Sequence, residues 1–230
     1  MRTESLKKLV AEIDARLDLP TKKDVAGVRT VRREFSKRLA SAPGEFVFRL
    51  AVQLLAKKES PPRFFVYELI QHHRDASRSL NSRKLKILGE GMDSWAAVDT
   101  FASYLSGPAW REHLISDALI ARWARSRNRW WRRAAVVSTV PLNNKARGGA
   151  GDAARTLQVC NLIAEDRDDM VVKALSWALR ELAKRDAEAV KAFLKDKQTL
   201  LSSRVVREVT NKLTTGLKNP TKNLTQHSIR

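Results

Sequence analysis

The stretch Asp93-Ser94-Trp95-Ala96-Ala97-Val98-Asp99 indicates how the chain folds. An α-helix turns by about 100° per residue, so a helix here gathers its apolar residues into one stripe. The members of this stripe are Val98, Phe101, Ala102 and Leu105. Trp95 and Asp99 lie four residues apart at its edge, so they are neighbours on the helix surface. Either Asp99 pairs with an arginine and Trp95 is boundary packing, or the two residues form part of a functional site.

The same helical periodicity recurs along nearly the whole chain, and no segment has a convincing strand pattern. The predicted helices cover residues 6–17, 28–39, 46–57, 64–73, 82–89, 93 onward, 110–125, 128–141, 153 onward, 168–185, 186–195 and 203–217. Short helices in series favour an all-α fold, an α-solenoid of HEAT-like antiparallel repeats; a compact bundle is the alternative. We expect one domain over residues 1–218 and a polar tail over residues 219–230.

The charge balance points to a polyanionic partner. Among 230 residues there are 44 lysines and arginines against 25 acidic residues, a formal net charge of +19. Nucleic acid is the commonest partner for such a surface, and an unspecialised basic surface is the alternative. A hydrophobic content of 43% excludes a largely disordered chain.

Other features narrow the class of protein. The single cysteine, Cys160, excludes an internal disulfide and lies in an apolar run, as a small core residue would. The charged first residues contain no signal-peptide core, and no stretch is apolar enough to cross a bilayer. We therefore expect a soluble, cytoplasmic protein without a membrane partner.

Segment 122–133 is the most basic part of the sequence and contains no acidic residue. Its arginines are Arg122, Arg125, Arg127, Arg129, Arg132 and Arg133, and they alternate with Trp123, Trp130 and Trp131. Cations between flat rings are typical of a surface that contacts phosphates. Arg133 differs from the others because it falls inside the apolar stripe of its helix. A buried guanidinium needs an anion, and Asp99 or a DNA phosphate are the candidates.

Trp177 is on the wrong face of its own helix to serve that helix's core. The apolar stripe of helix 171–184 consists of Val171, Leu175, Ala178, Leu179 and Leu182. Trp177 falls opposite this stripe, among Lys173, Arg180 and Lys184. Either a neighbouring helix covers the indole, or the ring is available to a nucleic acid beside cations that contact phosphates.

The remaining patterns do not indicate a cofactor. Gly148-Gly149-Ala150-Gly151 lacks the preceding strand and the lysine of a phosphate-binding loop, and we interpret it as a flexible connection. His72-His73 and Cys160 lack metal-ligand spacing, and no Ser/His/Asp set is visible. Asp99 is thus the one carboxylate that stands out for chemistry.

Three motifs together resemble the AlkD-type DNA alkylation repair glycosylases. These are residues 94–99 (SWAAVD), 130–135 (WWRRAA) and 173–181 (KALSWALRE), in this order and spacing, with a looser match from about Gly27 to the last helix. The resemblance implies an α-solenoid of HEAT-like repeats that forms a curved, basic groove around duplex DNA. It also implies excision of cationic N3- and N7-alkylpurines, leaving an abasic site. The sequence gives no sign of a metal or organic cofactor, and we expect a monomer without an obligate protein partner.

The resemblance also assigns roles to particular residues. Asp99 is similar to the family's catalytic carboxylate, Arg133 to its active-site arginine, and Trp95 and Trp177 to its two aromatic walls. Two departures concern the aromatic set: Ser94 stands where the family usually has a second tryptophan, and no aromatic residue precedes Phe35, where the family has an early tyrosine.

The chemistry of the residues agrees with this assignment. Release of a cationic purine builds positive charge on the sugar, which a nearby carboxylate stabilises while orienting water. Two other hypotheses remain open at this point. One is a non-catalytic HEAT-repeat protein that binds damaged or branched DNA, and the other is an RNA-binding or protein-scaffold solenoid.

Overall fold

The computed structural model describes residues 3–18, 24–57 and 61–220. Throughout these described ranges the regular structure is helical, without a β-strand. The chain divides into two compact units, Met1–Ile115 and Ser116–Arg230. The prediction of a single repeat domain stays a prediction, and most of the predicted polar tail, residues 221–230, lies outside the described residues.

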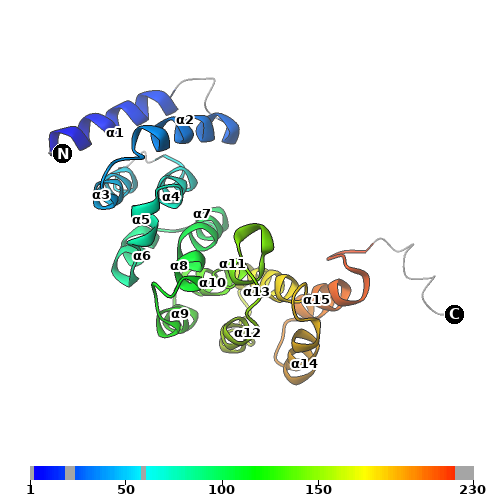
Figure 1. Ribbon diagram of the computed structural model, residues 1–230. Coiled ribbons are helices and arrows are strands. Elements are labelled where there is room, and N and C mark those ends of the chain that lie inside the picture. Colours follow the sequence, from blue (N-terminus) through cyan, green and yellow to red (C-terminus); the bar gives the residue numbers. More distant parts are fainter. Residues whose placement is uncertain (1–2, 19–23, 58–60, 221–230) are drawn as a thin grey trace. The chain divides into compact units, whose positions relative to one another are not determined.

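The first unit is a series of short amphipathic helices (Figure 1). Its elements are α1 (Thr3–Leu17), α2 (Val25–Arg38), α3 (Gly44–Leu55), α4 (Arg63–Gln71), α5 (Arg74–Arg78), α6 (Ser82–Gly89), α7 (Trp95–Phe101), the π-helix η2 (Ala102–Ser106) and α8 (Gly107–Arg111). Helix α4 packs against α2, α3 and α7, and Phe35, Phe65 and Phe101 are fully buried among them. The predicted stripe of α7 is confirmed, since Val98, Phe101, Ala102 and Leu105 are all inaccessible to solvent.

The chain between α7 and α9 differs from the prediction at two points. The helix predicted to begin at residue 110 instead begins at Gly107, directly after η2, and includes Pro108 in its first turn. The predicted single helix over residues 110–125 is wrong. Helix α8 ends at Arg111 and α9 begins at Asp117, and His113 between them has a left-handed φ of 57°. A non-glycine residue in that conformation interrupts a right-handed helix.

The second unit consists of α9 (Asp117–Ala124), α10 (Arg129–Val137), α11 (Val140–Asn143), the 3₁₀ turn η3 (Lys145–Arg147), α12 (Ala153–Leu162), α13 (Asp169–Leu182), α14 (Ala187–Lys197) and α15 (Ser203–Thr215). Helix α13 packs against both α10 and α15 (Figure 1). The three run in the same direction: Arg129 near the start of α10 pairs with Asp168, and Arg204 near the start of α15 pairs with Asp169. Three helix N-termini therefore lie at the same end of this unit.

The glycine-rich segment 148–151 is held within the second unit by hydrogen bonds and close backbone packing. Its interpretation as a flexible connection is therefore wrong. Arg185 Nε donates a 2.8 Å hydrogen bond to the carbonyl oxygen of Asn143, at the start of the loop. The amide of Gly151 donates to the carbonyl oxygen of Leu142 at 2.9 Å. Gly149 is buried, and a Cβ atom at this position would lie 2.5 Å from the carbonyl oxygen of Pro141. The glycine is therefore required by close approach of two backbone segments.

We expect Gly149→Ala to lower the free energy of unfolding by about 1–3 kcal/mol, as in other overpacked sites, because backbone atoms of Pro141 and Leu142 cannot yield as a flexible side chain would. The measurement is urea denaturation followed by circular dichroism. Gly216→Ala is the control, since no atom lies within 4 Å of its Cβ position and only its positive φ opposes the change. Equal losses for the two variants would contradict the proposed clash.

Candidate functional site

The first part of the candidate site is the exposed face of α7. Ser94 is the N-cap of this helix, and its Oγ accepts a 3.4 Å hydrogen bond from the amide of Ala97. With the helix beginning there, Trp95 falls in the first turn and Asp99 one turn later on the same side. Trp95 is 58% exposed, an unusual value for an indole, and Asp99 is half-buried. The predicted placement of a carboxylate beside a large ring is consistent with this helix.

The π-helix that follows α7 is a further feature of this region, and no sequence pattern indicated it. Residues Ala102–Ser106 form one π-helical segment between two α-helices. Such segments are rare and frequently occur at functional sites, because they rotate the following residues relative to the preceding turn. Phe101 anchors the junction through an edge-to-face contact with Tyr67, with ring centroids 5.7 Å apart. The Tyr67 hydroxyl in turn donates to the carbonyl oxygen of Leu88 at 3.0 Å.

A buried carboxylate on α4, the helix that packs against α7, is held by two arginines of α2. Glu68 is 4% exposed, and its two carboxylate oxygens accept hydrogen bonds from Arg29 at 3.0 Å and Arg32 at 3.1 Å. The hydrogen bond to Glu68 is the main reason that the pKa of Arg29 is raised above its usual value. This group joins α2 to α4, and it was not among the residues selected from the sequence.

In the second unit, Arg133 is buried within the apolar stripe of α10, as predicted. It is 6% exposed, and Ala134 and Val137 beside it are inaccessible. Its Nη1 donates to the carbonyl oxygen of Met170 in the first turn of α13. The guanidinium therefore replaces part of its lost hydration with a backbone carbonyl oxygen, and it joins α10 to α13.

The arginine-rich segment 122–133 divides into two groups. The side chains of Arg122, Arg125, Arg127 and Arg129 are exposed. Arg132 is instead committed to the protein, because its Nε donates to Asp166 at 2.6 Å and its Nη1 donates to two carbonyl oxygens of residues 126 and 127. The predicted role of Arg132 in DNA binding stays a prediction, but the structure gives this residue a separate role in closing the turn before α10.

The tryptophans of this segment are largely engaged in packing. Trp123 is 7% exposed, and its ring lies 4.8 Å from that of Trp131 at an angle of 42°. Trp130 is half-buried, with the guanidinium of Arg129 5.1 Å from its ring centroid. The segment therefore does not form a single exposed layer in which indole and guanidinium groups alternate.

Trp177 lies on α13, opposite the apolar stripe, and is half-buried. The basic residues near it are held by local partners: Lys173 pairs with Asp169 at 2.6 Å, and Lys184 pairs with Glu181 at 2.6 Å. Arg180 donates to the Ser176 hydroxyl at 3.3 Å, and burial lowers the pKa of Arg180. The face thus presents an indole ring among cations that each have a local partner.

The described residues lack several features that other functional classes require. No cluster of three or more potential metal ligands occurs in them. Cys160 is fully buried, and burial raises the pKa of its thiol to about 12, so it is not a reactive nucleophile. None of the described helices combines the length and the apolar character that a membrane span requires.

Residues 19–213 match the family model described as "DNA alkylation repair enzyme". The chain belongs to this family. DNA is accordingly a partner of this DNA alkylation repair enzyme. A search of curated proteins found no match.

Among solved structures, this repair enzyme is similar to AlkD2 from Streptococcus mutans, with a TM-score of 0.62 and 20% sequence identity. The alignment covers 90% of this chain and 96% of that one. This likeness confirms the predicted all-α fold of HEAT-like helical repeats.

We expect Arg132→Met to lower the free energy of unfolding by about 1.5–3 kcal/mol, because a charge-assisted hydrogen bond to Asp166 is lost. Arg122→Met removes the same charge from an exposed position and should leave stability nearly unchanged. Thermal unfolding of both variants measures the difference. If both variants unfold at the wild-type temperature, the structural role of Arg132 is wrong.

Proposed function

We propose that this protein is a DNA glycosylase of base excision repair. It hydrolyses the N-glycosidic bond of cationic N3- or N7-alkylated purines in duplex DNA and leaves an abasic site. The observation that carries the proposal is the half-buried Asp99 one turn after the exposed Trp95, in a member of the DNA alkylation repair family. A carboxylate and an accessible indole on one helix face suit a cationic nucleotide.

The reaction requires few catalytic groups besides this carboxylate. An alkylated purine with a formal positive charge leaves as a neutral base, so no general acid is needed to protonate the leaving group. As the glycosidic bond breaks, positive charge develops on the sugar. The carboxylate of Asp99 stabilises this charge and orients the water that adds to the sugar carbon. Electrostatic stabilisation of this kind is usually the largest single contribution to the rate.

The other residues are proposed to bind the substrate. Trp95 and Trp177 offer flat surfaces to the lesion-bearing nucleotide, and Arg133 contributes positive charge close to its phosphate. The wider DNA contacts are assigned to exposed or half-buried basic residues. These are Arg122, Arg125, Arg127, Arg129, Arg132, Lys173, Arg180 and Lys184. Of this set, Arg122, Arg125 and Arg127 carry the most weight, because their side chains are exposed and have no acidic partner in the described structure.

Ser94 favours the alternative of a non-catalytic helical-repeat protein that binds damaged or branched DNA. It takes the position at which related glycosylases usually have a tryptophan, and here it caps α7. A protein that only binds DNA, however, gains nothing from an acidic side chain facing phosphates, since the repulsion weakens binding. Asp99 therefore weighs in favour of the glycosylase.

We expect Asp99→Asn to reduce excision of N7-methylguanine by about 100-fold or more, as when one group that stabilises transition-state charge is removed elsewhere. Release of free base from duplex DNA under single-turnover conditions is the measurement. Asp93→Asn is the matched control, because Asp93 is an exposed carboxylate just before α7. Excision unaffected by Asp99→Asn would contradict the mechanism. Absence of base release by the wild type, with N3-methyladenine also tested, would favour the non-catalytic alternative.

We expect Trp95→Ala to slow excision while leaving the unfolding temperature within error of the wild type, because the ring is 58% exposed and contributes little to the core. The ratio of binding to lesion-containing and undamaged duplexes should fall in parallel. Fluorescence anisotropy with both duplexes gives this ratio. A variant with unchanged selectivity and rate would show that the indole has no part in recognition.

A further inference from the structure

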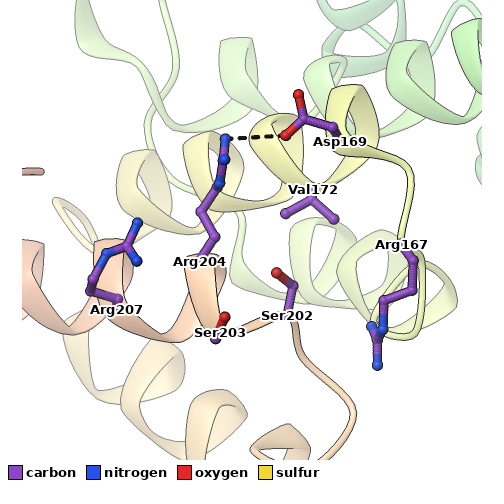
Figure 2. A pocket seen from close by; sticks show the side chains of 7 residues that line it. All are labelled: Arg167, Asp169, Val172, Ser202, Ser203, Arg204 and Arg207. Carbon is purple, nitrogen blue, oxygen red and sulfur yellow. Dashed lines mark ion pairs between the residues drawn. The ribbon is translucent and has the colours of Figure 1, made fainter.

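A polar pocket opens between the start of α13 and the start of α15 (Figure 2). Its volume is about 310 Å³. The polar lining consists of Arg167, Asp169, Ser202, Ser203, Arg204 and Arg207, with Val172 as the one apolar residue. Three guanidinium groups against one carboxylate give the lining a formal charge of two positive units. Pockets for small organic ligands are mostly apolar, so this lining is suited to an anion instead.

The three arginines have different roles. Arg167 Nη1 donates to the carbonyl oxygen of Leu200 at 2.9 Å, so this side chain ties the loop before α13 to the loop before α15. Arg204 and Arg207 lie three residues apart on α15 and therefore share one face of the helix. The side chain of Arg204 is 38% exposed, and Arg207 is exposed as well. These two arginines can reach a bound anion, whereas Arg167 contributes its charge from a fixed position.

Asp169 shows that an anionic oxygen fits against Arg204. Its Oδ1 lies 3.2 Å from Nη1 of Arg204, and its Oδ2 lies 2.6 Å from Nζ of Lys173 (Figure 2 shows the contact with Arg204). The hydrogen bond from Lys173, followed by the charges of Lys173 and Arg204, holds the pKa of Asp169 below its usual value. Asp169 is thus ionised at neutral pH, and it competes with any external anion for Arg204.

The start of α15 adds to the attraction for an anion. This helix has 13 residues, and the side chain of its N-cap Ser202 makes no capping hydrogen bond. In contrast, the N-cap Asp168 of α13 accepts a 2.9 Å hydrogen bond from the amide of Met170. The amides in the first turn of α15 therefore remain without a side-chain cap beside the arginines, at the positive end of the helix dipole.

We propose that this pocket binds a backbone phosphodiester of DNA, with Arg204 and Arg207 as its ligands. Guanidinium groups match the geometry of two phosphate oxygens, and the serine hydroxyls can donate to the same group. This inference rests on the proposed binding of duplex DNA. It adds a contact site that is separate from the residues assigned to the lesion.

The spacing of residues along α13 predicts which phosphate of a strand lying parallel to this helix reaches the pocket. Lys173 and Trp177 follow Asp169 at intervals of four residues along one face of α13. Eight residues of helix span about 12 Å. Phosphates follow one another by about 3.4 Å along the axis of each strand. For a DNA strand that runs along α13, we infer that the pocket takes a phosphate roughly three or four steps from the nucleotide against Trp177.

The first test uses the salt dependence of binding to an undamaged duplex. We expect Arg204→Met and Arg207→Met each to lower the slope of log K against log salt by about 1, and the double variant by about 2. Asp169→Asn should act in the opposite direction and tighten binding, because it removes the competing carboxylate. Lys195→Met is the control, since Lys195 is an exposed cation on α14, outside the pocket lining. Slopes equal to that of the control would overturn the proposal.

A second test locates the phosphate and identifies its kind. Single methylphosphonates, which are neutral, are placed along a duplex with a centrally located N7-methylguanine analogue resistant to excision. One position three or four steps from the lesion should weaken binding by the wild type and have no further effect on the double variant. If the double variant is impaired only on nicked duplexes with a terminal 5′-phosphate, the site is one for a monoester, and the phosphodiester proposal is wrong.

These binding tests do not depend on catalysis. Wild-type protein that shows the expected slopes without releasing any base would contradict the proposed glycosylase activity while supporting the pocket. Base release by a wild type whose pocket variants bind like the control would contradict the pocket alone.

Discussion

The second unit depends on the burial of one apolar stripe along α13. Val171, Leu175 and Leu179 are at most 1% exposed, and each such side chain contributes about 1.5–3 kcal/mol relative to an exposed position. Because α10 and α15 pack against this helix, its orientation about its own axis is set by that burial. The opposite face, with Lys173 and Trp177, must then point away from the core. The position of the proposed DNA-contacting surface follows here from a packing requirement.

In the first unit, burial of an apolar stripe likewise sets the orientation of α7, although this helix continues into a π-helical segment. Val98 and Phe101 are inaccessible, so α7 can turn only one face toward solvent, and this face includes Trp95 and Asp99. The π-helical segment Ala102–Ser106 then changes the register before α8. Because a π turn adds a residue to the helical cycle, the apolar residues on either side of it can both face the core. The carboxylate thus lies one turn before a structural irregularity in which every residue except Tyr104 is buried.

The sequence predicted the regular part of this structure from the spacing of apolar residues. The stripes of α7 and α13 and the burial of Arg133 all follow from helical geometry, and each is confirmed. The break after α8 was missed, because His113 has no sequence signal for its left-handed conformation. The partner of Arg132 was missed for another reason. Asp166 lies 34 residues away, and only tertiary packing brings the two together.

The same limitation explains why the pocket was not found. Arg167 and Arg204 come from different loops and helices, and neither belongs to a dense basic segment. A run of basic residues in a sequence suggests a DNA-binding surface. In the run at 122–133, however, Arg132 pairs with Asp166 within the protein. Spacing along the chain therefore does not show which basic residues are available to bind DNA. The acidic partners that the fold gives to each of them show this better.

Those acidic partners are concentrated at the start of α13. Asp166 pairs with Arg132 at 2.6 Å, Asp168 with Arg129 at 3.3 Å, and Asp169 with Arg204 at 3.2 Å. Carboxylates at a helix N-terminus are favoured by the helix dipole, so they stabilise α13 while drawing arginines from both neighbouring helices.

In a chain of formal charge +19, this arrangement separates two populations of cations. The better-buried pair, Arg132 with Asp166, stabilises the fold. The exposed pairs contribute little to stability, since solvent screens them, and DNA phosphates can compete for their cations at small cost. Arg204 is in this second class because its partner Asp169 is 54% exposed. A DNA phosphate can displace an exposed carboxylate from its arginine. An arginine that binds phosphate in the complex needs such a replaceable partner in the free protein.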